Sequence, residues 1–505
     1  MPANVHYVSS DTARFDVFAG SLPSGEPRLV RQELLWGDRV RRLGPGRSAT
    51  EWRVRARGRT GYVARAALGG DPLLEVYFID VGQGDGILIC TPERRHILID
   101  GGWPRRGQPT GKNAADFVDW KFAKDYEMDR IDLDAVMCSH NDQDHYGGLW
   151  DLFNPEEEHE LDIPTSRVTA ERFYHAGLSW WRENGRRTLG RTVETPLGRM
   201  HTQLIDSRNS VLDGLRAGAD PALQGEWADF LETMTKVRTR AGTLTPMQRL
   251  GHSAGYVPGF APGDGDVAIR VLAPVEFDVD GRTGIRYYAG GSSKNTNGNS
   301  LLLRLDYGRS RVLLTGDLNT KSMRALLDDW TGERQEFQCD VAKACHHGSD
   351  DVSYDFLAAM RPAVTIISSG DNEGHDHPRP GVIAASATTG YLSIEDDRIV
   401  SPLIYSTELA RSVRIGKLTA LEVPDNGGSR KLSAAEFART RAELAVTMAG
   451  DRRPSSRTRN ARGSYVVAGT VYGLVNVRTD GERILCATLN EAGYRWQVKT
   501  LSSRF

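Results

Sequence analysis

The string SHNDQDHYGG (139–148) constrains this chain more than any other feature. It follows the apolar run DAVMC, which we expect to form a buried strand, and it places His140, Asp142, Asp144 and His145 close together in sequence. Imidazole and carboxylate groups that leave a strand together can point at one centre. Borderline divalent cations such as Zn²⁺ and Mn²⁺ accept both donor types. The string therefore predicts a metal site at a strand end.

Two later strand candidates end in further metal-binding side chains. The run RVLLTGD ends in Asp317, whose carboxylate can bridge two cations, and AKACHH ends in His346 and His347. Taken singly, an Asp at a strand end is more often a helix cap. The ordered recurrence of such side chains at successive strand ends instead predicts one composite site.

The apolar runs around these motifs predict a mixed α/β fold. Near-continuous apolar stretches indicate strands that are covered on both faces. Two such blocks flank residues 178–250, where NSVLDGLRAG and GEWADFLETMTKVRTRA are typical of helices, so we expect a helical cap insertion there. This order predicts an αββα sandwich.

Residues 1–70 have a different character, with short strand candidates separated by Gly and polar turns. The ending WRVRARGRTGYVARAAL (52–68) resembles the last hairpin of bacterial SH3-like barrels. The alternative is a generic β-module. In either case we expect a docking unit, and the resemblance implies a protein partner.

A second insertion is expected over residues 408–467. It contains a helix start with a capping box, Ser433 followed by Glu436. The arginine-rich stretch 451–463 lacks apolar periodicity, so we expect an exposed and mobile segment that a trypsin-like protease could cut to activate the protein.

Bulk composition narrows the class of protein. A length of 505 residues predicts more than one domain, and a formal charge of −2 gives no global attraction for polyanions. No apolar run is long enough for a membrane span, and the first residues lack a signal-peptide pattern. The five cysteines are scattered without CxxC spacing. We therefore expect reduced thiols, a cytoplasmic location and no membrane contact.

The ordered motifs together resemble a known family. The set FIDVGQGD, LIDGG, SHNDQDHYGG, NGNSLLLRLDYGRSRVLLTGD and HHGS resembles the metallo-β-lactamase superfamily and, more closely, its ComEC-like branch, named after a DNA-uptake channel protein. The resemblance implies one hydrolase domain over residues 74–505, interrupted by the two insertions. Its motifs are specific for fold and metal site and much less specific for substrate.

The resemblance also implies a set of ligands for two divalent metal ions, Zn²⁺ or Mn²⁺. His140 and Asp142 would hold the first ion, whereas Asp144, His145 and His346 would hold the second. Asp317 would bridge the two. The superfamily usually has His in place of Asp142, but the ComEC-like branch also has Asp there.

Three further residues match family positions. Asp100, which ends HILIDGG, would orient ligands from behind. His175 is a candidate third ligand for the first ion, and the alternative is a packed core histidine. His377, before Pro378, could donate a proton to the leaving oxygen or hold a phosphate, and the alternative is a loop histidine that fixes the turn.

The chemistry expected of such a site is hydrolysis of a phosphodiester. We expect a DNA nuclease in which Asp144 or the bridging Asp317 orients the nucleophile and His347 or His377 protonates the leaving group. Defence against invading DNA is a role that fits such an enzyme. An arginine run beside Trp180 and Trp181 suits backbone contact and base stacking, although a solvated helical face is the alternative. The arginines of that run are Arg182, Arg186, Arg187 and Arg191.

Two other functions remain open. One is hydrolysis of a smaller ester, such as a phosphocholine ester or a cyclic nucleotide, which a closed lid would favour. The other is a non-catalytic docking protein, against which the complete ligand series argues.

Overall fold

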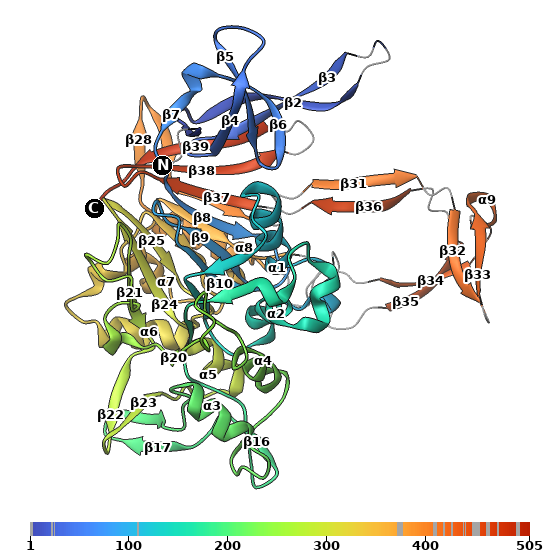
Figure 1. Ribbon diagram of the computed structural model, residues 1–505. Helices are drawn as coiled ribbons and strands as arrows, with labels where there is room; N and C mark the ends of the chain where they lie inside the picture. The colour runs from blue at the N-terminus through green and yellow to red at the C-terminus, as the bar shows by residue number, and fades with distance from the viewer. Residues whose placement is uncertain are drawn as a thin grey trace.

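A computed structural model provides the structure of the chain (Figure 1). It describes residues 4–21, 24, 26–108, 111–370, 377–407, 412–417, 420–425, 428–437, 439, 441–446, 455–460, 465–471, 474–490 and 495–505. Within these ranges, no helix has the length and apolar character that crossing a membrane requires. All five cysteines are free and buried, as the sequence predicts.

The N-terminal residues form a seven-stranded antiparallel sheet in the order β3-β2-β6-β5-β4-β1-β7. Its apolar side chains alternate along the strands and meet in a small core that includes Phe15, Leu34 and Val63. The strands are β1 (Val5–Val8), β2 (Thr12–Ser21), β3 (Pro27–Leu35), β4 (Arg39–Pro45), β5 (Glu51–Ala56), β6 (Arg59–Ala64) and β7 (Leu68–Gly70).

A nine-stranded sheet begins the main body of the molecule, in the order β20-β14-β12-β10-β9-β8-β37-β38-β39. The β20-β14-β12-β10 end is parallel and the rest is antiparallel, and the strands are nearly continuous in apolar residues because helices cover one face and a second sheet covers the other. Its strands are β8 (Leu74–Ile79), β9 (Gly86–Cys90), β10 (His96–Gly101), β12 (Ala135–Cys138), β14 (Phe173–His175), β20 (Met247–Arg249), β37 (Leu474–Thr479), β38 (Arg483–Asn490) and β39 (Arg495–Ser502).

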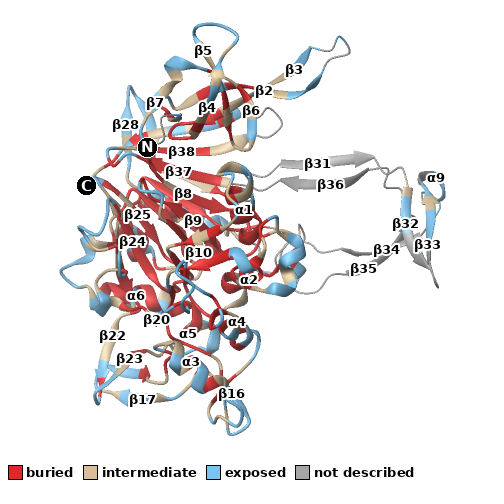
Figure 2. Cartoon of the chain, viewed as in Figure 1, coloured by how far each residue is buried: buried red, intermediate tan, exposed pale blue. Residues whose placement is uncertain are grey.

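The second sheet of the main body has six strands in the order β21-β24-β25-β26-β27-β30. The two sheets face each other across one apolar core, to which Phe78 and Ile99 contribute from the first sheet and Leu303 and Ile366 from the second. Figure 2 shows the buried residues concentrated in these layers. Its strands are β21 (Ala268–Ala273), β24 (Leu302–Tyr307), β25 (Ser310–Leu314), β26 (Val341–Lys343), β27 (Val364–Ile367) and β30 (Leu403–Ser406).

Helices cover the outer face of each sheet. On the first sheet, Val118, Leu149 and Phe230 of three helices pack against strand residues. On the second sheet, Leu326 and Phe356 do the same. The helices are α1 (Ala114–Trp120), α2 (Gln143–Phe153) and α4 (Glu226–Met234) on one side, and α6 (Thr320–Asp329), α7 (Tyr354–Met360) and α8 (Pro380–Thr389) on the other. The predicted mixed α/β class is confirmed.

The first insertion, residues 178–250, is less helical than expected. Both predicted helices are present, as α3 (Arg208–Leu215) and α4. The remainder forms short strands because its polar and apolar residues alternate around tight turns. These are β15 (Trp181–Glu183), β16 (Arg186–Thr188), β17 (Thr192–Thr195), β18 (Gly198–His201) and β19 (Ala222–Leu223). β18 pairs with β23 (Arg282–Arg286), which pairs with β22 (Glu276–Val279).

The second insertion contains three strand pairs. They are β31 (Ser412–Lys417) with β36 (Tyr465–Val471), β32 (Ala420–Asp425) with β33 (Gly428–Ser433), and β34 (Arg441–Val446) with β35 (Ser455–Asn460). The expected capping box begins α9 (Ala434–Phe437), where the backbone N–H of Glu436 donates to Ser433 Oγ. Part of the arginine-rich stretch is strand β35, which corrects the expectation of no regular structure. Residues 451–454 and 461–463 lie outside the described residues.

A buried charge network joins the N-terminal sheet to the main body, where Figure 1 shows β38 and β39 beside it. Arg478 of β37 is almost fully buried; it pairs with Asp38 at 2.8 Å and donates to the carbonyl oxygen of Trp36. The indole of Trp496 donates to the carbonyl oxygen of Glu33. The N-terminal sheet is therefore held on the main body and is not merely tethered to it.

Candidate metal centre

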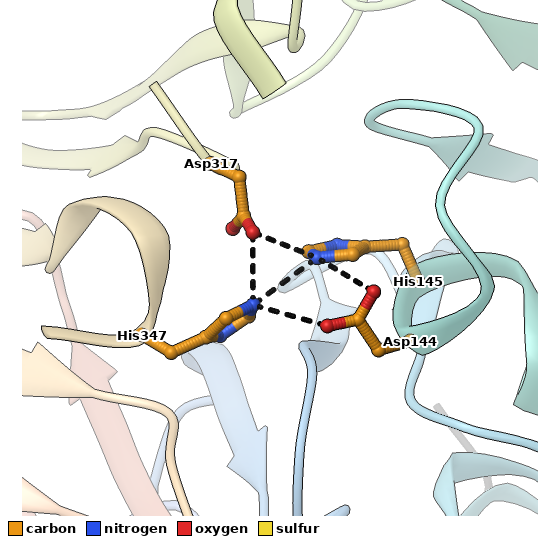
Figure 3. Close-up of side chains that lie close together, drawn as sticks. All are labelled: Asp144, His145, Asp317 and His347. Carbon is orange, nitrogen blue, oxygen red and sulfur yellow. Dashed lines mark hydrogen bonds and ion pairs between the residues drawn. The ribbon is translucent and has the colours of Figure 1, made fainter. Parts of the chain in front are cut away.

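Four acidic and imidazole side chains from three separate segments converge at the ends of the strands (Figure 3). Asp144 and His145 lie in the first turn of α2, Asp317 follows β25, and His347 lies in the turn η8 (Cys345–Gly348) after β26. One ligand atom from each lies within 4.8 Å of the others. The sequence prediction of a composite site at strand ends is confirmed in this geometry.

The two histidines of this cluster are oriented by hydrogen bonds on their far sides. His145 Nδ1 lies 2.8 Å from Asp100 Oδ2, and His347 Nδ1 lies 3.1 Å from the carbonyl oxygen of Ser368. Because both partners are acceptors, each Nδ1 carries a proton, and each Nε2 is left to face Asp317. The two Nε2 atoms lie 3.2 Å apart.

Asp317 Oδ2 is the focus of the site. It lies 3.0 Å from His347 Nε2, 3.4 Å from His145 Nε2, 3.9 Å from His346 Nε2 and 4.0 Å from His140 Nε2. Lone pairs that converge on a carboxylate repel one another unless a cation lies between them. The nitrogen and oxygen donor set therefore fits divalent metal ions of the Zn²⁺ or Mn²⁺ type.

The electrostatics favour positive charge at the same point. Burial opposes the charged form of His145, yet Asp317, Asp100 and Asp144 raise its pKa well above the ordinary value. Burial also opposes a charged His347, but Asp317 and Asp85 raise its pKa to about 9. The negative potential that raises the proton affinity of these imidazoles also favours metal cations, which compete with protons for the same nitrogen atoms.

Asp100 lies where the sequence places it, behind the ligands. It ends β10 with a left-handed backbone (φ 56°), and this bend turns its carboxylate toward α2. Oδ1 accepts from the backbone N–H of Ser139 at 2.7 Å, while Oδ2 holds His145. One carboxylate thus fixes both the loop that carries the ligands and the ring of one ligand.

A second group of donors lies on the His140 side of Asp317. His140 Nε2 is buried, has no hydrogen-bond partner among the described residues, and lies 3.6 Å from Asp142 Oδ2. Asp142 is the N-cap residue of α2, yet its side chain makes no capping bond and instead accepts from Thr296 Oγ1 at 3.0 Å. Both side chains are therefore positioned to bind a second cation with Asp317.

His175 lies beside this second group but outside the four-residue cluster. It lines a small pocket together with His140, Leu178, Trp227 and Thr296. Neither of its ring nitrogens has a hydrogen-bond partner among the residues described, and burial lowers its pKa to about 3. The ring is neutral and is available as a further ligand in this pocket.

The structure places the two adjacent histidines of HHGS the other way round from our expectation. His347, expected to be an acid, is fully buried and points at Asp317. His346, expected to be a ligand, is partly exposed and lies against the side-chain amide of Asn297. Both backbones are left-handed, with φ of 45° and 51°, so the turn directs the rings apart. The ring of His377 lies 5.7 Å from that of His346, and both residues are half-buried.

Sequence reasoning missed three residues that support the cluster. Lys343 and Asp85 are fully buried and pair at 2.5 Å, and Lys343 also lies 3.4 Å from Asp317 Oδ1. The amide of Gln83 donates to Asp144 Oδ2 at 3.0 Å. A lysine inside the apolar strand VAKAC was the one sequence signal that could have revealed this pair.

The arginine run near Trp180 forms the β15–β16 hairpin, not the helical face that we weighed as an alternative. Arg182, Arg186 and Arg187 are exposed, and the Arg187 guanidinium lies 3.9 Å above the Trp180 ring. Arg191 pairs with Glu183 and is therefore already neutralised. The hairpin follows Leu178, which lines the pocket beside His140.

Comparisons with known proteins agree with this geometry. The Metallo-beta-lactamase superfamily model matches residues 79–187. ComE operon protein 3 of Bacillus subtilis (strain 168) is 22% identical over 320 residues, covering 61% of this chain and 30% of that protein. Competence protein ComA of Neisseria gonorrhoeae is 36% identical over 87 residues, covering 17% of this chain and 12% of that protein. The similarity thus spans less than a third of either relative.

Among solved structures, one similar fold is the crystal structure of a metal-dependent hydrolase of the β-lactamase superfamily. It is 10% identical, with a TM-score of 0.29, and the match covers 66% of this chain and 96% of that one. Residues 79–187, which the family model matches, contain five of the side chains at this centre, namely Asp100, His140, Asp142, Asp144 and His145. Residues 79–187 therefore match the Metallo-beta-lactamase superfamily and contribute to a His/Asp cluster that could hold a metal ion, and the chain is distantly similar to ComE operon protein 3 and to ComA.

Proposed function

We propose that the protein is a metal-dependent hydrolase of phosphodiester bonds and that its substrate is DNA. The observation that carries this proposal is the set of four histidine Nε2 atoms within 4.0 Å of a single oxygen of Asp317. A carboxylate surrounded in this way suits a pair of cations that share it as a bridge.

The ligands fall into two groups. His140 and Asp142 would hold the first ion, with His175 available in the adjoining pocket, and Asp144, His145 and His347 would hold the second. Asp317 is shared by both. Zn²⁺ and Mn²⁺ suit this mixed nitrogen and oxygen set. Bound metal ions of this kind supply an activated water at neutral pH and offset the charge that develops on a phosphoryl oxygen.

The chain itself supplies orientation and proton transfer. Asp144, held by Gln83, is placed to orient the attacking water. His346 and His377 lie together, half-buried, and their rings are 5.7 Å apart. We assign leaving-group protonation to this pair, because His347 is buried behind Asp317.

DNA is favoured over other phosphodiesters by the exposed arginines next to the pocket. Arg182, Arg186 and Arg187 bear no ion pair among the described residues, so they remain available to phosphates. We further propose that the main body is an αββα sandwich and that the N-terminal sheet is an SH3-like barrel with a protein partner. We also propose a cytoplasmic location and a role in defence against invading DNA. Cleavage within 451–463 would activate the protein.

One observation favours a smaller ester as the second candidate. Trp227 of α4 and Leu178 close the pocket beside His140, as a lid over a small substrate would. Phosphocholine esters and cyclic nucleotides belong to this class.

The test compares these substrates directly. Purified protein with Mn²⁺ or Zn²⁺ is incubated with plasmid, linear duplex and single-stranded DNA, and separately with bis-p-nitrophenyl phosphate and a phosphocholine ester. We expect DNA to be cut, Asp144→Ala to abolish cutting, and Asp213→Ala, which removes an exposed acid of α3, to leave it intact. Turnover of a small ester without cutting of DNA under either metal would move the assignment to the second candidate.

A further inference from the structure

The N-terminal sheet carries a charge opposite in sign to the rest of the chain. Residues 1–70 contain twelve arginines, no lysine and six acidic residues, a formal charge of +6, whereas the whole chain carries −2. The remainder is therefore acidic overall. A local positive field on a separate module indicates a polyanionic partner for that module.

Part of this charge already serves the contact with the main body. Arg41 and Arg55 both pair with Glu127, and Arg57 pairs with Asp38. These three arginines are thus accounted for by packing. Arg31 and Arg53, by contrast, are exposed, and the β2–β3 hairpin projects away from the main body (Figure 1).

One outward face of the sheet combines arginines with aromatic rings. Strand register aligns Arg31, Asp16, Tyr62 and Arg53 in a single row across β3, β2, β6 and β5. Because neighbouring strands lie ~4.8 Å apart, the row spans roughly 14 Å. Phe18 lies on the same face, with its ring centre 5.3 Å from that of Tyr62. We call the set Arg31, Arg53, Tyr62 and Phe18 the arginine–aromatic face.

The charges of this face are available to a ligand. Asp16, the carboxylate in the row, is neutralised by Arg14 at 2.8 Å and Arg47 at 2.7 Å. In the part of the chain that the structure describes, Arg31 and Arg53 form no ion pair, and both are exposed. The Arg53 guanidinium lies 5.7 Å from the centre of the Phe18 ring. The rings of Tyr62 and Phe18 are half-buried, and the Arg47 guanidinium lies 4.7 Å over the centre of the Tyr62 ring. Guanidinium groups beside aromatic rings offer phosphate contact and base stacking together.

We propose that the arginine–aromatic face binds single-stranded nucleic acid and holds it for the metal centre. The bases stack on Tyr62 and Phe18 while Arg31 and Arg53 contact phosphates. The choice of nucleic acid over another polyanion rests on the proposed nuclease function. Rings favour a single strand, because duplex bases are already stacked.

Binding is tested without turnover. Anisotropy of a fluorescein-labelled oligothymidine of about 20 nucleotides is measured with EDTA present, across a salt series. We expect Arg31→Gln with Arg53→Gln to weaken binding roughly tenfold at low salt and to lower the slope of log affinity against log salt by about 1.4, since each single-strand phosphate contact contributes about 0.7. Tyr62→Ala should weaken binding roughly fivefold and leave the slope unchanged.

A matched control carries the same charge change elsewhere. Arg282→Gln with Arg324→Gln removes two exposed arginines of β23 and α6, and we expect wild-type binding. Melting temperatures equal to that of the wild type confirm that every variant is folded. Wild-type binding by the Arg31/Arg53 variant, or no saturable binding by the wild type, overturns the inference. Duplex DNA bound as tightly as oligothymidine overturns the single-strand assignment.

The outcomes separate this inference from the nuclease proposal. Asp144→Ala should bind oligothymidine as the wild type does, because the face lies outside the metal centre. DNA cutting without binding at this face would refute the inference alone. Binding at this face without cutting under any metal would refute the nuclease proposal alone.

Discussion

The Nε2 atoms of His145 and His347 lie 3.2 Å apart, and both face Asp317 because an acceptor holds each ring at its Nδ1 atom. These two residues come from different layers of the main body, one from α2 and one from the turn after β26. Their approach is stabilised only if a cation lies between them and Asp317.

The first prediction concerns metal affinity. Asp100→Ala removes the carboxylate that holds His145 Nδ1 and the Ser139 backbone, so we expect Zn²⁺ affinity to fall about 10–100-fold. Competition with a chelating dye measures the change. Asp213→Ala, on an exposed helix, should bind Zn²⁺ like the wild type. Unchanged affinity in Asp100→Ala would show that the ring is oriented by other contacts.

The second prediction concerns the buried Lys343–Asp85 pair. Lys343→Met leaves Asp85 and Asp317 without their shared cation in a fully buried site, and we expect the free energy of unfolding to fall by about 3–5 kcal/mol in EDTA. Urea titration monitors this change. Adding Asp85→Asn to Lys343→Met should restore part of the lost stability. A double variant less stable than Lys343→Met would contradict the pairing.

The third prediction concerns pH and His96. Burial and nearby Arg94 lower the pKa of His96 to about 3, while the ring packs against Phe122 and Tyr126. The unfolded chain therefore takes up a proton below about pH 6.5 that the folded chain refuses, so stability falls as pH decreases from there toward 3. The contribution is about 1.4 kcal/mol for each pH unit.

His96→Phe keeps the ring packing and removes the titrating group. We expect urea titrations at pH 7.5 and pH 5.5 to show a smaller loss of stability for this variant than for the wild type, because its unfolded chain has no His96 to take up a proton. Parallel losses in both proteins would mean that His96 titrates normally in the folded state.

The fourth prediction concerns the junction between the N-terminal sheet and the main body. Arg478→Leu leaves the buried Asp38 with only Arg57 as a close cation, and we expect about 3 kcal/mol of lost stability. Arg57 and Arg478 overcome burial to hold the pKa of Asp38 at about 2. Loss of Arg478 should bring the pKa of folded Asp38 closer to that of the unfolded chain, so the variant should lose less stability than the wild type on acidification below about pH 4, as calorimetry over a pH series will measure.

The sequence predicts the centre well because each ligand ends an apolar strand, and strand ends of a layered fold meet at one edge. His140, His145 and Asp317 needed no tertiary information beyond that rule. The order of His346 and His347 could not be predicted, because two successive left-handed residues decide which ring faces inward. Asp85 and Lys343 are paired only by the tertiary fold, so their partnership was invisible in the chain.

The strand pairing of the first sheet has a consequence for synthesis. β8 is hydrogen-bonded to β37, which follows it by roughly 400 residues along the chain. While the ribosome is making the intervening segments, the β8 edge of the nascent chain stays open to other strands. Cellular yield should therefore depend on chaperones that shield that edge until β37 emerges.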